Sequence, residues 1–199
     1  MATNTPRSRS SMMEETRLKL IAAGRHAFAQ KGFAAASMDD LTAAAGLTRG
    51  ALYHHFGDKK GLLAAVVAQI DGEMAERARL AGEKAITGWA ALEAQGVAYI
   101  EAALDPEIQR IVLLDGPAFL GDPSQWPSQC ACLEDTRVAL AKMHGAGVLK
   151  PVDIEAAARM LNGAALNAAL WVAASEDPHA TLPKALDAFR LISSGFLAA

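Results

Sequence analysis

Apolar residues recur along this chain at the spacing of one helical face, every three or four residues. In the first segment Leu18, Ile21 and Phe28 follow this spacing. Gly32 comes next, and glycine commonly terminates helices. The pattern therefore predicts an amphipathic helix from about residue 12 to residue 31.

Two short helices separated by a tight turn are predicted next. Ser37 suits the N-cap of the first, with carboxylates in the following turn, and Gly46 suits its end. Thr48 suits the cap of the second, over residues 49–56. Such a pair is typical of a helix-turn-helix, whose second helix fits the major groove of DNA.

The rest of the chain predicts six further helices. We expect them at about residues 58–82, 87–104, 105–114, 128–144, 153–175 and 181–196, with Thr87, Asp105, Asp153 and Thr181 as caps. Gly116-Pro117 and Gly121-Asp122-Pro123 are expected to break the chain, which leaves Phe119 and Trp126 on or beside loops. No segment alternates convincingly like a strand, so the fold class is all-α with about nine helices.

Composition and charge refine this interpretation. The chain of 199 residues is 52% hydrophobic and 6% aromatic, and alanine, the best helix former, supplies most of the excess. The formal net charge is −3, but residues 1–60 have a net charge of +4 and residues 61–199 a net charge of −7. This asymmetry indicates a basic binding module joined to an acidic body.

The two short helices leave a polar face beside their apolar one. Leu41, Ala45, Leu47, Leu52 and Phe56 are spaced to pack against the first helix. The opposite face of the second short helix has six residues suited to phosphates and base edges: Thr48, Arg49, Gly50, Tyr53, His54 and His55.

This region resembles the tetracycline-repressor (TetR) family of transcriptional regulators. The resemblance rests on Phe28-Ala29-Gln30-Lys31-Gly32-Phe33, on Ser37, on the run from Ala45 to Phe56 (AGLTRGALYHHF), and on Lys59-Lys60-Gly61-Leu62. It covers about a quarter of the chain, with more than ten constrained positions. It implies a DNA-binding domain over residues 12–57 and a ligand-binding and dimerisation domain over residues 58–199. Residues 1–11, rich in Ser, Thr, Arg and Pro, are expected to form a disordered arm.

The resemblance also implies roles for single residues. Arg49 would reach base edges, and Gly50 would let the backbone approach the DNA. Contacts to backbone phosphates are expected from Arg17, Ser37, Thr48, Tyr53, His54, His55 and Lys59. His55 has packing as an alternative role, and Lys60 is expected to be solvated.

Dimerisation and effector binding are predicted in the larger domain. For a homodimer formed by the last two helices, the candidates are Ala157, Leu161, Ala164, Ala168, Trp171, Leu186 and Phe189. Each of these has monomer core as an equal alternative. Candidate effector contacts are Tyr99, Phe119, Trp126, Met143, His144 and Asn162, which have core packing as their alternative.

Other functional classes lack support in the sequence. It has no G-x-S-x-G, no H-E-x-x-H and no phosphate-binding glycine loop, so we expect no enzyme and no cofactor. Cys130 and Cys132 are either two small hydrophobic residues or half of a zinc site without a second half, and we expect no metal. The polar start lacks a signal core and no segment suits a membrane span, so a cytoplasmic protein is expected.

These observations predict a repressor that a small, largely hydrophobic effector releases from a palindromic operator in double-stranded DNA. A ligand-independent regulator and an activating regulator remain the alternatives.

Overall fold

The computed structural model describes residues 9–198, and all statements of absence below refer to them. They form two compact units, one ending at Val67 and the other beginning at Ala68, which we call the N-terminal unit and the C-terminal unit. The predicted disordered arm lies mostly in residues 1–8, outside the described residues.

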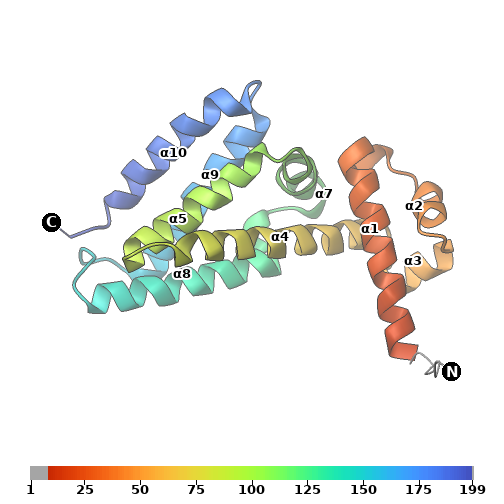
Figure 1. Cartoon of the computed structure of the whole chain (residues 1–199), viewed down its shortest axis with the longest axis horizontal. Coiled ribbons are helices and arrows are strands. Elements are labelled where there is room, and N and C mark those ends of the chain that lie inside the picture. Colours follow the sequence, from red (N-terminus) through yellow and green to blue (C-terminus); the bar gives the residue numbers. More distant parts are fainter. Residues whose placement is uncertain (1–8, 199) are drawn as a thin grey trace, which may run out of the picture. The chain divides into compact units, whose positions relative to one another are not determined.

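The N-terminal unit contains three helices and the start of a fourth (Figure 1). These helices are α1 (Arg9–Ala35), α2 (Met38–Ala44), α3 (Arg49–Phe56) and the first part of α4 (Lys59–Glu83). The first helix begins three residues before its predicted start and includes a kink at Gly32, whose φ of 74° suits glycine. Leu20, Phe28, Leu41, Leu52 and Leu62 are fully or almost fully buried and form the core of this unit.

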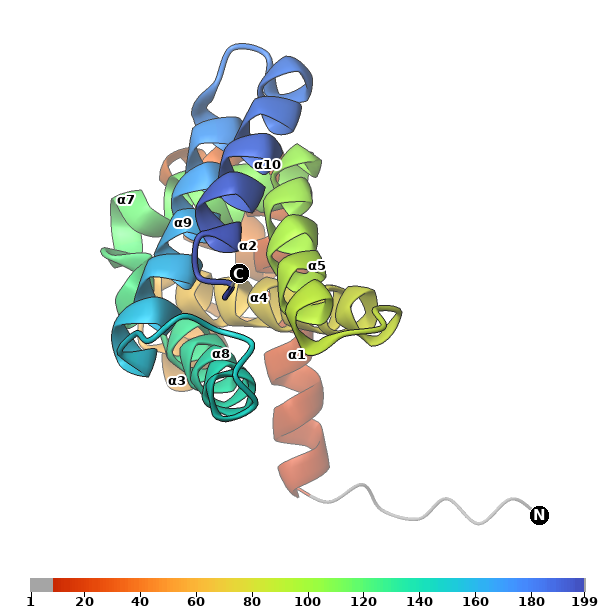
Figure 2. The ribbon, with the colours of Figure 1, turned by 90° about the vertical axis from the view of Figure 1, so that its left-hand side faces the viewer.

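The C-terminal unit contains the remainder of α4 and the later helices. They are α5 (Gly88–Glu101), α6 (Pro106–Ile108), α7 (Gly116–Leu120), α8 (Pro127–Gly145), α9 (Ile154–Ala174) and α10 (Pro178–Ser194). Two 3-10 turns, Ala102–Leu104 and Pro123–Gln125, and a π-helical segment, Gln109–Asp115, complete the order. Helix α9 is central, because it packs against α5, α8 and α10 (Figures 1 and 2).

The predicted all-α fold class is confirmed. An isolated bridge between Leu149 and Leu197 is the extent of β-structure among the described residues. The predicted caps Ser37, Thr48, Thr87, Asp105 and Asp153 each accept a hydrogen bond from a backbone N–H of the following turn.

The predicted break at Gly116-Pro117 is wrong. Gly116-Pro117 does not break the chain: Pro117 lies in the first turn of α7, where its missing N–H is not needed, and the break comes at Gly121. Phe119 consequently lies on a helix, whereas Trp126 lies between two helical segments as expected. Gly116 itself is packed so closely on Trp126 that a Cβ would lie 2.7 Å from the indole.

The last helix also begins earlier than predicted. Asp177 caps α10 by accepting from the N–H of Ala180, and Pro178 follows in the first turn. Thr181, the predicted cap, is buried one turn inside the helix. The Asp-Pro start prevails here because it combines a side-chain cap with a proline suited to the first turn.

Candidate nucleic-acid interface and effector cavity

The first candidate site is the exposed face of α3 in the N-terminal unit. Leu52 is fully buried and fixes the helix against the core, whereas Arg49, Gly50 and His54 are exposed and Tyr53 is 55% exposed. Thr48 is exposed at the cap, where its hydroxyl accepts from the N–H of Ala51 at 3.3 Å. The helix thus presents donors on one side and leucine on the other.

Two of the residues predicted to contact DNA also make contacts within the N-terminal unit. His55 is half-buried and its ring lies 6.0 Å from that of Phe56, so its alternative role in packing has a structural basis. The guanidinium of Arg17 lies 5.9 Å from the centre of the Phe56 ring and 3.7 Å from the carboxylate of Glu14. Both side chains still reach the surface of this unit.

The side chain of Lys59 is held by the end of α1. Its Nζ donates to the carbonyl oxygens of Ala34 at 3.3 Å and Ala36 at 2.8 Å, and it lies 4.5 Å from the centre of the Phe33 ring. Lys59 therefore fixes the end of α1 to the start of α4, with one N–H not used in these bonds.

Arg49 has a partner that sequence reasoning missed. Its Nε and Nη2 donate to the two carboxylate oxygens of Asp39, in the first turn of α2. This hydrogen bonding, together with charge attraction, raises the pKa of Arg49. The bidentate pair orients the guanidinium, but it occupies the same fork that would bind a guanine.

Glycines shape the same region. Gly46 and Gly57 have φ of 65° and 76°, which allows the tight turns on both sides of α3. A Cβ on Gly61 would overlap the carbonyl oxygen of Phe56. By contrast, a Cβ on Gly50 would meet only Thr48 Oγ1, at an ordinary 3.7 Å, so the protein's own packing does not require glycine there.

The second candidate site is a cavity of about 520 Å³ in the C-terminal unit. Residues from α4, α5, α8, α9 and α10 line it, including Asp71, Trp89, Tyr99, Cys132 and Leu161. Its volume is in the range of drug-sized ligand sites, and its lining is mainly apolar with a few polar groups.

Two of the predicted effector residues, Tyr99 and Asn162, line this cavity. Tyr99 accepts from Gln129 Nε2 at 3.4 Å, and Thr136 donates to Asn162 Oδ1 at 2.9 Å. The other four do not line it. Met143 belongs to a core cluster with Leu140 and Leu149, and His144 is exposed near the end of α8. Trp126 packs on Gly116, and Phe119 lies on α7.

Asp71 is the cavity residue that sequence reasoning missed most clearly. It is 4% exposed, and Ser128 Oγ donates to its Oδ2 at 2.6 Å. Burial raises the pKa of Asp71, and the hydrogen bond from Ser128 offsets only part of that effect. A sequence signal existed, because Asp71 interrupts the apolar run of α4, but any exposed aspartate gives the same signal.

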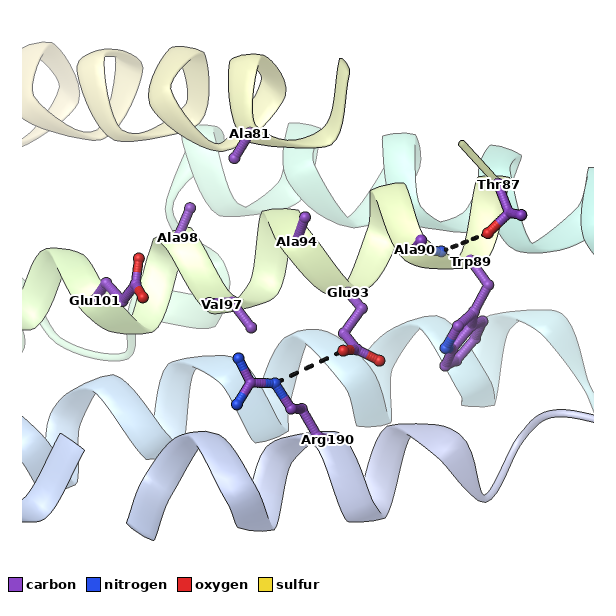
Figure 3. A pocket seen from close by; sticks show the side chains of 10 residues that line it. All are labelled: Ala81, Thr87, Trp89, Ala90, Glu93, Ala94, Val97, Ala98, Glu101 and Arg190. Carbon is purple, nitrogen blue, oxygen red and sulfur yellow. Dashed lines mark hydrogen bonds and ion pairs between the residues drawn. The ribbon is translucent and has the colours of Figure 1, made fainter. Parts of the chain in front are cut away.

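A smaller pocket of about 410 Å³ lies beside this cavity, and the two share Trp89 and Glu93 (Figure 3). Glu93 on α5 lies 3.7 Å from Arg190 on α10, across the pocket. Glu101 also lines it, so carboxylates outnumber guanidinium groups in its wall.

The structure favours the monomer-core alternative for four of the predicted dimer residues. Ala157, Leu161, Leu186 and Phe189 are buried within the single chain, because the core face of a helix has the same apolar spacing as a dimer face. Ala164 and Ala168 are half-buried and Trp171 is 50% exposed. Met160 on α9 and Leu191 on α10 are exposed large hydrophobic residues that the sequence did not single out.

The sequence also makes predictions about the cysteines, metal ligands and membrane spans. Cys130 is exposed and Cys132 is partly buried, and both are free thiols. In the part of the chain that the structure describes, no group of three or more His, Cys, Asp or Glu side chains is arranged to bind a metal. Nor does any helix within residues 9–198 have the length and apolarity needed to cross a membrane.

Comparison with known proteins assigns both units. Residues 20–66 match the family model of bacterial regulatory proteins of the tetR family, and residues 89–196 match that of the tetracyclin repressor-like C-terminal domain. A crystal structure of a TetR-family transcriptional regulator from Pectobacterium atrosepticum is 47% identical and superposes with a TM-score of 0.87, covering 97% of this chain and 99% of that one.

Two curated relatives match shorter stretches of the chain. The transcriptional repressor AcnR of Corynebacterium jeikeium is 28% identical over 159 residues, which are 78% of this chain and 80% of AcnR. The TetC protein of transposon Tn10 from Escherichia coli is 34% identical over 96 residues, and this match spans 46% of each protein, less than half of the relative's length. The matched families are those of regulators rather than enzymes. The chain therefore belongs to the TetR family of bacterial transcriptional regulators.

Proposed function

We propose that this protein is a homodimeric repressor that binds a palindromic operator through α3 and is released by a small, largely hydrophobic effector. The observation on which this depends is the division of α3 into two faces. Leu52 is fully buried, while Arg49, Gly50 and Tyr53 lie together on the solvent side. An exposed helix face of this composition suits base edges and phosphates.

In this proposal Arg49 makes the contact that selects sequence. It exchanges the carboxylate of Asp39 for the O6 and N7 of a guanine, which present a similar pair of acceptors. Gly50 permits close approach of the backbone. Seven other residues contact phosphates, and these contacts fix the position of the helix without selecting sequence. They are Arg17, Ser37, Thr48, Tyr53, His54, His55 and Lys59.

The proposed dimer surface is the exposed side of α9 and α10. Met160, Ala164, Asn167 and Trp171 recur every three or four residues along α9, and Leu191 is 76% exposed on α10. Exposed apolar side chains gathered on one helix face commonly mark a protein interface. A two-fold dimer would present two copies of α3 to two half-sites.

Effector release requires a connection between the cavity and α3. Helix α4 provides a continuous one, because it begins with Lys59 in the N-terminal unit and contributes Asp71 and Met74 to the cavity wall in the C-terminal unit. We propose that a bound ligand favours one of two positions of α4 and so changes the separation of the two α3 helices in the dimer. A regulator without an effector would have no need of such a cavity.

The test begins with selection of bound duplexes from a random pool. Fluorescence anisotropy then compares the selected operator with a scrambled duplex for the wild type, Arg49→Ala and Lys60→Ala. We expect Arg49→Ala to weaken operator binding roughly ten- to a hundredfold per half-site while scrambled DNA keeps its weak, salt-dependent affinity. Lys60→Ala removes the same charge from the start of α4 and should leave the operator preference unchanged.

The proposal fails if Arg49→Ala retains the wild-type preference for the operator, or if the wild type binds no duplex at low salt. The effector part is tested separately, by adding compounds that raise the melting temperature to the preformed protein–operator complex. Stabilising compounds that leave the complex intact would contradict release.

A further inference from the structure

The wall of the 520 Å³ cavity contains a buried carboxylate oxygen without a hydrogen-bond partner. Among the described residues, Asp71 Oδ2 accepts from Ser128 and Oδ1 accepts from none, although both belong to a side chain that is 4% exposed. An unsatisfied buried acceptor is costly, and buried polar groups are normally paired. Asp71 Oδ1 is therefore an acceptor that a donor on a bound ligand would satisfy.

Aromatic rings form another part of the same wall. Trp89, Tyr99 and Phe189 all line the cavity. Burial raises the pKa of the Tyr99 phenol, which therefore stays neutral, and nearby Asp71 raises it further. Neutral aromatic faces attract ammonium groups, most strongly where water is excluded.

The charged residues around the cavity favour a cation. Glu76 and Arg79 neutralise each other, with 2.7 Å between their paired atoms, and Glu93 faces Arg190. Asp71 and Asp135 line the cavity, and neither has an ion-pair partner in the part of the chain that the structure describes. An anionic ligand would meet these carboxylates, whereas a cation would compensate them.

We propose that the effector is a protonated amine on an apolar body, with an N–H donating to Asp71 Oδ1 and the ammonium group beside the rings of Tyr99 and Phe189. This inference rests on the proposed function of the cavity as an effector site, and it adds the chemical class of the ligand. The apolar body would contact Met74, Leu92 and Leu161, which belong to the same wall.

The experiment uses three probes of similar size with different head groups: 4-phenylbutylamine, 4-phenylbutanol and 4-phenylbutyric acid. Isothermal titration calorimetry without DNA measures their binding to the full chain and to Asp71→Asn. The matched control is Asp135→Asn, which removes a carboxylate of the same lining from an exposed position.

We expect the amine to bind the wild type about tenfold or more tightly than the alcohol, equivalent to about 1.4 kcal/mol, and the acid to bind most weakly. Asp71→Asn should lose this preference, while Asp135→Asn should keep most of it. Equal binding of the amine and the alcohol, tighter binding of the acid, or no binding of any probe at millimolar concentration would each overturn the inference. The wild-type ranking alone decides the matter if Asp71→Asn does not fold.

The outcome is separable from that of the proposed function. Amine binding that depends on Asp71 but leaves the operator complex intact supports the cavity chemistry and contradicts effector release. Release of the operator by compounds that bind independently of Asp71 supports effector release and contradicts the amine.

Discussion

The two candidate sites of this protein are built in opposite ways. The α3 face of the N-terminal unit is exposed, and short-range features hold it: the Ser37 and Thr48 caps and the glycine turns at Gly46 and Gly57. The cavity of the C-terminal unit is lined by five helices, whose contributing residues extend from Asp71 to Ser193. A surface fixed by local geometry tolerates little change in its turns, whereas a cavity depends on side chains distant in sequence.

The largest expected effect is on the free energy of unfolding, and it is expected for a substitution at Gly61. Its missing Cβ leaves room for the carbonyl oxygen of Phe56, which backbone geometry holds in place. We expect Gly61→Ala to destabilise the protein by about 2–4 kcal/mol, measured by urea denaturation, because the turn before α4 must shift.

Gly72, in the same helix, provides the matched control. It is exposed, and a methyl group added to its Cα would have nothing within 4 Å. Gly72→Ala should stabilise the helix by about 0.5–1 kcal/mol. Equal effects of the two substitutions would contradict the claim that local geometry limits the N-terminal unit more strictly.

A second effect, on DNA affinity, is expected at Gly50. Because a Cβ there would meet only Thr48 Oγ1 at 3.7 Å, the fold does not need glycine at this position. We expect Gly50→Ala to unfold at the same or higher denaturant concentration and to bind the operator about tenfold more weakly, since the methyl group would keep the backbone from the DNA. Unchanged anisotropy titrations would show that α3 does not approach the duplex at Gly50.

The same contrast explains what the sequence could predict. Ser37, Thr48, Thr87, Asp105 and Asp153 can be identified as caps because a cap depends on the few residues beside it. The exposed face of α3 follows from the short apolar spacing around Leu52. Such features need no knowledge of the tertiary fold.

The cavity and the proposed dimer face could not be derived in this way. Tyr99 and Asn162 line the cavity, but Met143, an equally plausible candidate in the sequence, lies in the core instead. Similarly, Leu161 and Met160 are adjacent apolar residues of α9, and one is buried while the other is 63% exposed. Which face meets a neighbour is decided by the packing of α5, α8 and α10 on α9, which the sequence of one helix does not contain.

A third effect concerns the pH dependence of stability. Burial raises the pKa of Asp71 above that of an exposed carboxyl, so the folded protein retains this proton to higher pH than the unfolded chain does. Stability should therefore fall as pH rises from the unfolded pKa to the folded one, by at most about 1.4 kcal/mol per pH unit for one group. The nearby Tyr99 and Cys132 have raised pKa values and stay neutral in this range.

Asp71→Asn removes this titration without changing the size of the side chain. Urea denaturation in mildly acidic buffers should give a difference between wild type and variant that grows with pH in favour of the variant. Asp135→Asn serves as the control, because it removes an exposed carboxylate from the same cavity lining. A constant difference for Asp71→Asn would mean that the Asp71 carboxyl has the same pKa in the folded protein and in the unfolded chain, which would contradict this prediction.

The smallest effect is expected at Asp39, whose carboxylate holds the guanidinium of Arg49. An exposed ion pair adds little stability, but in the proposed complex it would compete with DNA for the arginine fork. Asp39→Asn should therefore raise operator affinity by about two- to fivefold, partly by removing a negative charge near the phosphates and partly by freeing Arg49. Asp40→Asn separates the two causes, because Asp40 lies in the same first turn of α2 and pairs with Lys31 instead. Both variants should bind scrambled DNA slightly more tightly, and only Asp39→Asn should increase the ratio of operator to scrambled affinity. Were that ratio to fall, the Asp39 carboxylate would be acting to orient Arg49 for the bases rather than to occupy it.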